Sequence, residues 1–318
     1  MPEWLVERGI GETRAVLVDG NKIVEARIHL AGVARAGTRL PARLTSIGAN
    51  GRNAVATDEG GAEYLLPSGA RGITEGATLT IEVTREAIPG CEPWKRPLAK
   101  VSEEGPGEAP PSEGRSLAFP SSPDELGAHG WHDVIEEAST GIVRFAGGEL
   151  RMSPTPAMTL IDVDGTLPPE ELAIAGAAEA AKAIRRLDIG GSIGIDLPTS
   201  GSKAARQKAG ERIDAHLPQP FERTAVNGFG FVQVVRPRRR PSLLELAQDR
   251  APFEARALLR RAAFEGAGAK RLVAHPAIAA LLHAQPTWID ALSRQIGGAV
   301  ELRPEPSLPI SGGYAEKR

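Results

Sequence analysis

The first ninety residues alternate short apolar segments with turns rich in glycine and polar residues. Residues 13–18 and 22–28 are two such segments, and the turn Asp19-Gly20-Asn21 between them predicts a β-hairpin. About five short strands within about 50 residues are typical of a small barrel such as an OB-fold. The strands expected here are residues 40–47, 53–57, 63–66 and 78–84.

The composition changes after this region. The segment AKVSEEGPGEAPPSEG, residues 99–114, is rich in proline, glycine and glutamate and poor in large apolar residues. Such a segment buries too little apolar surface to fold alone. We therefore predict a flexible acidic linker at 99–114.

The second half of the chain alternates strand-like and helix-like patterns. Residues 169–187 are alanine-rich, begin after a proline and carry acidic residues in the first turn and basic residues in the last, which predicts a helix. This helix joins two apolar strands, 158–163 and 192–197, and a strand–helix–strand unit of this kind makes its strands parallel. Further elements are expected as helices at 131–139, 203–217, 242–248, 253–265, 276–284 and 288–296 and as strands at 142–145, 149–152, 224–235 and 299–303.

Three aspartates stand at the ends of these two strands. The first strand ends in Asp162 and Asp164, and the second ends at Asp196. Because side chains alternate along a strand and parallel strands end at the same edge of a sheet, we expect the three carboxylates to lie together. An isolated Asp-x-Asp-Gly is equally typical of a polar strand end before a turn. The third carboxylate favours a site for a hard divalent cation, Mg²⁺ or Mn²⁺.

Composition and charge exclude some classes of protein. The net charge of −2 argues neither for nor against a nucleic-acid partner, although residues 101–150 carry 10 acidic and 2 basic side chains and 151–240 carry 13 basic and 10 acidic ones. The single cysteine, Cys91, excludes an intrachain disulfide framework and a cysteine-rich zinc site. The sequence shows no signal peptide and no run of about 18 apolar residues. We expect a soluble, cytoplasmic protein with no membrane partner.

Taken alone, the segment LIDVDGTL resembles the first motif of haloacid-dehalogenase-type phosphatases. In that family an apolar strand presents Asp-x-Asp-Gly-Thr, which implies Asp162 as the nucleophile and Asp164 as the general acid. The family also needs a late acidic pair after a strand, and this sequence shows none after Asp196.

A second resemblance runs in order along nearly the whole chain. The segments RAVLVDGNKIVEARI, LPARLTSI and YLLPSG are similar to the opening hairpin and the inserted OB-fold of the bacterial ribonuclease E/G family. GGELRMSPTPAMTLIDVDG and EAAKAIRRLDIGGSIGIDLPTS resemble the strands and helix around that family's catalytic site. NGFGFVQVVRPR resembles a later strand, and HPAIAALL and VELRPEP resemble its C-terminal small domain. Several collinear matches favour this family over the phosphatases.

The ribonuclease resemblance implies a mixed α/β (α+β) architecture built from several parts. These are an RNase H-like part at 1–35 continued by 115–145, an OB-fold RNA-binding-like domain at 36–98, the linker at 99–114, a DNase I-like, metal-dependent catalytic α/β domain at 146–240 and a small C-terminal α/β domain at 241–318.

The same resemblance implies a metal-dependent endoribonuclease that binds single-stranded RNA in RNA processing or decay. Asp162 and Asp196 would hold Mg²⁺ or Mn²⁺, and Asp164 would complete the catalytic group by orienting the attacking water. Aromatic residues make up 4% of the chain, so extensive base stacking is not expected. The candidate RNA contacts are Tyr64, Lys95, Lys203, Arg206, Arg236 and Arg238.

Several positions differ from the family pattern. Thr199 replaces the second acidic residue of the later strand, Gln233 replaces a glutamate, and Asp164 stands where the family has Asn. The paired cysteines that hold zinc between two subunits are missing, so we expect no structural zinc. A homo-oligomer remains possible, but not through a cysteine–zinc link. The chain is also too short for the family's sensor of an RNA 5′-monophosphate. A catalytically weakened RNA-binding protein of this family and, with less support, the phosphatase are the alternatives.

Overall fold

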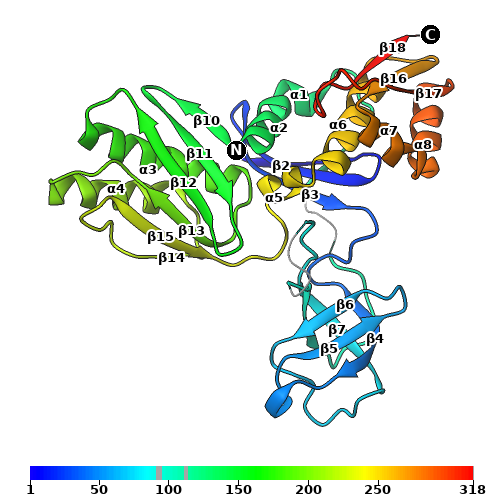
Figure 1. Cartoon of the computed structure of the whole chain (residues 1–318), viewed down its shortest axis with the longest axis horizontal. Helices are drawn as coiled ribbons and strands as arrows, with labels where there is room; N and C mark the ends of the chain where they lie inside the picture. The colour runs from blue at the N-terminus through cyan, green and yellow to red at the C-terminus, as the bar shows by residue number, and fades with distance from the viewer. Residues whose placement is uncertain (91–94, 111–113, 318) are drawn as a thin grey trace.

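The computed structural model describes residues 1–90, 95–110 and 114–317 and consists of three β-sheets, a closed barrel and the helices around them (Figure 1). Cys91 and Trp94 lie outside the described residues. The mixed α/β class and the five-stranded barrel agree with the prediction. None of the helices in the described ranges combines the length and the apolar character that crossing a bilayer requires.

The chain begins with a four-stranded sheet in the order β3-β2-β1-β9. β2 and β3 form the predicted antiparallel hairpin, and Gly20 supplies the positive φ that its turn needs. β9 joins this sheet beside β1 after the chain has passed through the barrel, so the barrel is an insertion in the sheet. The strands are β1 (Glu3–Arg8), β2 (Glu12–Asp19), β3 (Lys22–Leu30) and β9 (Arg115–Leu117).

The inserted barrel closes in the order β4-β5-β6-β8-β7 around a core that includes small side chains such as Ala42 and Ala54. The predicted linker at 99–114 begins inside its strand β8, so that boundary was wrong. Ala99 and Val101 alternate with polar neighbours in the two-residue period of a strand, and pairing with β7 completes it. The elements are β4 (Arg39–Ser46), η1 (Ala49–Gly51), β5 (Ala54–Asp58), β6 (Glu63–Leu66), β7 (Thr78–Arg85) and β8 (Leu98–Val101).

A six-stranded sheet in the order β10-β11-β12-β13-β15-β14 forms the middle of the chain. β12 and β13, joined by α3, are parallel neighbours as predicted, and β11 and β15 flank them in antiparallel orientation. α3 packs against this sheet with α4 beside it (Figure 1). The elements are β10 (Ile142–Phe145), β11 (Gly148–Pro154), β12 (Thr159–Gly165), α3 (Pro169–Arg186), β13 (Gly191–Asp196), α4 (Lys203–His216), β14 (Glu222–Arg223) and β15 (Phe231–Arg236).

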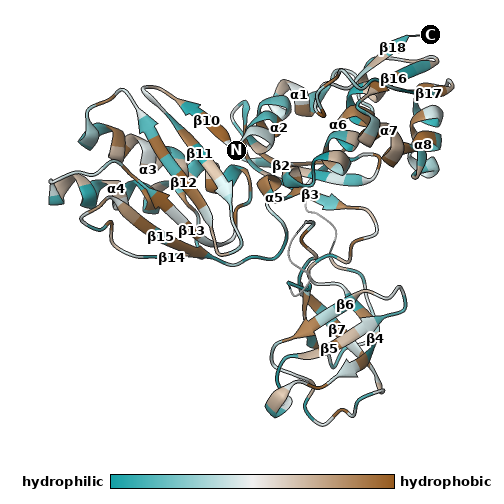
Figure 2. Ribbon diagram, viewed as in Figure 1, coloured by the Kyte–Doolittle hydropathy of each residue, from teal (hydrophilic) through white to brown (hydrophobic). Residues whose placement is uncertain are grey.

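Burial alternates along β12, which gives the six-stranded sheet a packed face and an exposed face. Ile161 and Val163 are buried on the side of α3, whereas Leu160 and Asp162 point the other way and are exposed. Figure 2 shows apolar and polar residues interleaved on these strands. Gly176 of α3 lies against Val163, and a Cβ atom at this position would overlap that side chain. The missing side chain therefore lets the helix approach the strand closely.

Helices and a three-stranded sheet end the chain. The four predicted helices are present, but β16 was not predicted, and β18 lies where a polar tail was expected. β18 is a strand because it pairs with β16, which its polar sequence does not reveal. The elements are α5 (Leu243–Gln248), α6 (Arg250–Phe264), β16 (Lys270–Ala274), α7 (Pro276–His283), α8 (Pro286–Ile296), β17 (Val300–Pro304) and β18 (Tyr314–Lys317).

One apolar core joins the N-terminal sheet to the six-stranded sheet. Val16 of β2 belongs to the same buried cluster as Ile161 and Ile195, whereas the barrel has a core of its own. The segments 1–35 and 146–240, predicted as separate parts, are therefore packed together. The two helices that precede the six-stranded sheet are α1 (Glu125–Ala128) and α2 (Trp131–Thr140).

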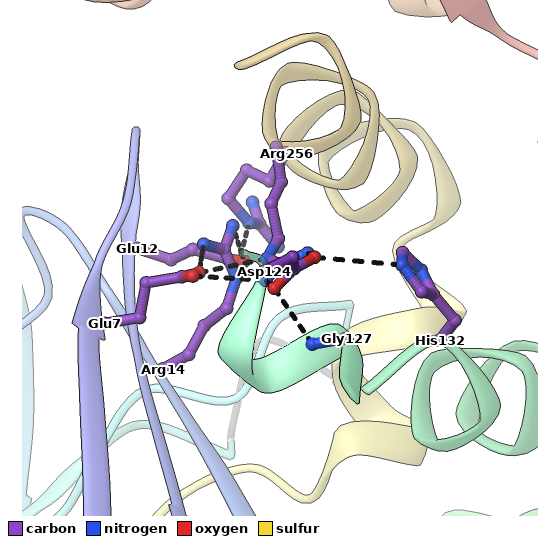
Figure 3. A network of polar contacts seen from close by, with 8 residues as sticks. Glu7, Glu12, Arg14, Asp124, Gly127, His132 and Arg256 are labelled. Carbon is purple, nitrogen blue, oxygen red and sulfur yellow. Dashed lines mark hydrogen bonds and ion pairs between the residues drawn. The ribbon is translucent and has the colours of Figure 1, made fainter. Parts of the chain in front are cut away.

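A buried charge network links the N-terminal sheet to the C-terminal helices (Figure 3). Glu7 accepts hydrogen bonds from Arg14 at 2.7 Å and from Arg260 at 2.9 Å. Arg260 also donates to Asp124, which caps α1. Three carboxylates face three guanidinium groups, so the network is balanced in charge. Its members are Glu7, Glu12, Arg14, Asp124, Arg256 and Arg260.

Candidate functional site

Three aspartates lie on the exposed face of the six-stranded sheet. Asp162 and Asp164 are two residues apart in β12 and therefore share a face, and Asp196 is the last residue of β13. The register of the two parallel strands pairs Asp162 directly with Asp196. The prediction that these strands bring their carboxylates to one edge of the sheet is confirmed. We refer to Asp162, Asp164 and Asp196 as the carboxylate cluster.

The carboxylates of the cluster influence one another. Burial raises the pKa of Asp162, and the charges of Asp164 and Asp196, together with a side-chain hydrogen bond to Asp164, raise it further. Arg151 stands opposite Asp162 in β11, but its guanidinium pairs with Glu149. Within the described part of the chain, no member of the cluster forms an ion pair with a basic side chain.

The carboxylates of the cluster suit a cation that is bound by only a few protein ligands. Across the described ranges, no three His, Cys, Asp or Glu side chains are arranged to hold a metal ion as they stand. Mg²⁺ is commonly bound through one or two carboxylates together with waters and substrate phosphates, so Asp162 and Asp196 are a sufficient protein donor set. The repulsion that contributes to the raised pKa of Asp162 is what a divalent cation would relieve.

Tyr64, a predicted RNA contact, belongs to the barrel core. Its side chain is 4% exposed, and its hydroxyl donates a hydrogen bond to Asp58 at 3.2 Å. Burial, followed by the charge of Asp58, raises the pKa of Tyr64 to about 12. The alternation along β6 turns Tyr64 inward and its neighbours Glu63 and Leu65 outward. Tyr64 is therefore not exposed for the RNA contact that the sequence predicted.

Arg236 and Arg238 are also engaged inside the fold. Arg236 donates to the carbonyl of Ile189 at 2.9 Å, and burial lowers its pKa. Arg238 pairs with Glu245 of α5. Both guanidinium groups are held by protein acceptors, so a phosphate would have to compete with these bonds.

The remaining predicted RNA contacts differ in their surroundings. Arg206 is half-buried and donates to the carbonyl of Ser200 at 2.7 Å. Lys95 reaches the carbonyl of Pro156, in the connection between β11 and β12. Lys203, the first residue of α4, is exposed and makes no hydrogen bond or ion pair with any described residue. Lys203 is therefore the member of the predicted set best placed to bind a phosphate.

Sequence reasoning missed the apolar residues on the same face. Leu160 of β12 is exposed, and Phe231 of β15 is the register neighbour of Asp196. Phe229, in the turn before β15, is 80% exposed. The two-residue period of β15 places Phe231 beside Asp196, but the predicted strand at 224–235 began too early to reveal this.

An arginine-lined hollow lies at the junction of the N-terminal sheet and the barrel. Its volume is about 600 Å³, and Arg27 and Arg240 are among its lining residues. Arg27 bonds to Glu25 at 3.0 Å, and Arg240 bonds to Asp188 at 2.8 Å. The carboxylate cluster does not line this hollow.

No protein-family model matches this chain, and no curated protein matches it.

Proposed function

We propose that this protein is a metal-dependent endoribonuclease that hydrolyses phosphodiester bonds in single-stranded RNA. The observation that carries the proposal is the register pairing of Asp162 with Asp196 on an exposed sheet face. No basic side chain of the described chain neutralises them. Carboxylates in this situation suit a divalent cation that also binds a substrate phosphate.

The roles of the cluster follow from its geometry. When bound, Mg²⁺ or Mn²⁺ would supply an activated water and offset the charge of the reacting phosphoryl group. Asp162 and Asp196 would hold the cation from neighbouring strands. Asp164, two residues from Asp162 on the same face of β12, would orient a water held by the cation and accept a proton from it. Lys203 offers an exposed positive charge for an RNA phosphate.

The order of the sheets supports the ribonuclease resemblance. In the proposal, the N-terminal sheet is the RNase H-like part, the barrel inserted between β3 and β9 is the RNA-binding OB-fold, and the six-stranded sheet is the DNase I-like catalytic part. Because Tyr64 is buried, exposed arginines of the barrel replace it as candidate contacts for RNA phosphates. They are Arg43, Arg52 and Arg71.

The direct test is cleavage of an unstructured RNA oligonucleotide in the presence of Mg²⁺ or Mn²⁺. We expect the wild type to cleave it and leave 5′-phosphate ends, and we expect Asp162→Ala and Asp196→Ala to lose cleavage while they still bind RNA. Equal activity of all three proteins would overturn the proposal.

A catalytically weakened RNA-binding protein is the second candidate. It is favoured by the finding that no three ligands in the described ranges stand ready for a metal. Gln233 also favours it, since its side chain donates to Ser192 at 2.9 Å where the family has a carboxylate. RNA binding that weakens with salt and is not followed by turnover would support this candidate.

The phosphatase alternative has less support. The closed barrel that precedes the motif and the lack of a later acidic pair both count against it. Release of phosphate from a small phosphomonoester, lost in Asp162→Asn, would revive it.

A further inference from the structure

We infer that Leu160, Phe229 and Phe231 form a stacking surface for unpaired bases next to the phosphodiester that the carboxylate cluster receives. This inference rests on the proposed function and specifies that the substrate must have unpaired bases next to the cleaved phosphodiester. Six large apolar side chains of the described chain are exposed, and Leu160, Phe229 and Val235 are three of them. All three belong to the six-stranded sheet or to the turn that enters it. Leu160 is two residues from Asp162, and Phe229 lies two residues before the register partner of Asp196, whereas Val235 lies at the other end of β15.

Phe231 lies across the sheet beside the cluster. As the register partner of Asp196 it stands on the same face, with Cβ atoms about 4.5–5.5 Å apart. Its ring leans over Gly194, because a Cβ atom there would lie 2.7 Å from Cζ of Phe231 and 3.0 Å from Cδ2 of Leu160. The glycine thus leaves room for the ring and Leu160 to meet. They form a continuous apolar surface about 7 Å along the strands from the row of Asp162 and Asp196.

The turn that carries Phe229 is fastened to the strand end that carries Asp196. The side chain of Asn227 accepts hydrogen bonds from the N–H groups of Phe229, at 2.9 Å, and of Phe231, at 3.0 Å. Thr199 donates to the carbonyl of Phe229 at 3.1 Å. The exposed side chain of Phe229 is therefore carried by an anchored backbone beyond the end of β13, whereas the ring of Phe231 leans toward Gly194 on the other side of Asp196.

An unpaired base suits this surface better than a protein partner does. Stable protein interfaces use about 20–30 residues a side, whereas the exposed apolar residues here are few and are bordered by exposed charges such as Arg151 and Asp164. A base presents a flat apolar face, and its sugar carries the phosphodiester that the cluster would receive. Bases within a duplex are already stacked and paired and do not offer this face. The surface therefore selects single-stranded nucleotides at the site of cleavage.

The test compares Phe229→Ala and Phe231→Ala with the wild type on a short oligouridine. Binding is measured by fluorescence anisotropy and cleavage by steady-state kinetics. We expect Kd and KM to rise by about 5- to 150-fold in each variant, the range of base–aromatic stacking, with a smaller change in kcat. Phe229→Trp should restore binding. Tyr314→Ala is the control, because Tyr314 is an exposed aromatic residue on the three-stranded sheet. Phe229 is largely exposed, so Phe229→Ala should fold and test the stacking surface even if Phe231→Ala does not fold.

An abasic scan of the oligonucleotide identifies the stacked base. Removing that base should weaken binding to the wild type, and the same removal should have no further effect on the phenylalanine variant whose ring it contacts. Additive effects at every position would overturn the inference, even if the wild type cleaves. Coupled effects on binding without cleavage would keep the stacking surface and overturn the proposed function, so the two failures are distinguishable.

Discussion

Two groups of three carboxylates occupy this molecule in opposite surroundings. In the buried charge network each carboxylate pairs with an arginine, and Glu7, which is 0% exposed, and Glu12 each pair with two. In the carboxylate cluster the aspartates lie on an exposed face and form no ion pair with the described residues. Partial desolvation and the charges of Asp164 and Asp196 raise the pKa of Asp162. The two groups contain the same number of acids, so the difference lies in the counter-charges that the fold provides.

This difference distinguishes acids that are paired within the fold from acids that are available to a ligand. A buried carboxylate without a partner costs several kcal/mol, so Glu7 and Glu12 require the arginines that face them. Exposed carboxylates need no ion-pair partner because water solvates them, but neighbouring carboxylates still repel one another. Asp162 stands opposite Asp196, and no basic side chain of the described residues pairs with either, so a bound cation would relieve their repulsion.

The largest predicted effect is the loss of RNA cleavage when one charge of the carboxylate cluster is removed, and stability should not fall. Asp162→Asn keeps the shape of the side chain but removes a charge that holds the cation. Since such a cation stabilises the transition state by several kcal/mol, we expect kcat/KM for RNA cleavage to fall by about a thousandfold or more. The free energy of unfolding in urea should not fall, because repulsion with Asp164 and Asp196 is relieved.

Glu170→Gln is the matched control, because Glu170 is an exposed acid at the start of α3. Unchanged turnover in Asp162→Asn, or a large loss of stability, would remove the distinction between the two groups.

Neutralising the buried network should act on stability instead. Glu7→Gln leaves Arg14 and Arg260 buried without a carboxylate that they share, and we expect the free energy of unfolding to fall by about 3–5 kcal/mol. Folded protein should keep its cleavage of RNA. Glu3→Gln is the control in the same strand, since its pair with Arg115 is exposed and contributes about 0–1 kcal/mol. Equal stability of the two variants in urea would contradict the assigned role of Glu7.

Local patterns explain what the sequence could predict. The β2–β3 hairpin, α3 and the parallel pair β12–β13 follow from alternation, turn residues and helix ends within short segments. Asp162 and Asp196 could be placed together because one helix separates their strands. The burial of Tyr64 could also have been predicted, since the alternation along β6 turns it inward.

Long-range pairing explains what the sequence could not predict. Arg260 bonds to Glu7 although 253 positions separate them, and on α6 alone an arginine is typical of a solvated helix face. Arg236 likewise appeared to belong to an exposed basic cluster, whereas the turn after α3 supplies its carbonyl acceptor. The position of Phe231 beside Asp196 could be recognised only once the true start of β15 was known. In each case the partner comes from a distant element, so local periodicity carries no signal.

Crowding the helix beneath the cluster should have an intermediate effect. Gly176→Leu places a large side chain where even a Cβ atom overlaps Val163, the residue between Asp162 and Asp164. We expect the free energy of unfolding in urea to fall by about 1–3 kcal/mol, the usual cost of overpacking. The displaced strand should also weaken the apparent affinity for Mg²⁺ in cleavage assays. Ala178→Leu is the control, since Ala178 lies on α3 beside a hollow of about 460 Å³.

The smallest predicted effect concerns the partly exposed edge of the buried network. Burial raises the pKa of Asp124, but hydrogen bonds from Arg260 and from the N–H of Gly127 outweigh it and hold the pKa below its usual value. A carboxyl group whose folded pKa is lowered stabilises the protein above its unfolded pKa of about 3.9, and this contribution is lost as the pH falls through the folded pKa. His132, at 4.0 Å, adds attraction only when protonated.

Asp124→Asn tests this contribution, because the amide oxygen can still accept from Gly127 while the charge facing Arg260 is lost. We expect the variant to be less stable than the wild type by about 1 kcal/mol at about pH 7, since the side chain is partly exposed. Urea unfolding at successively lower pH should bring the two proteins together below about pH 4. A difference that stays constant down to about pH 2 would show that Asp124 acts through capping and packing and not through its charge. The charge balance of the network would then rest on Glu7 and Glu12 alone.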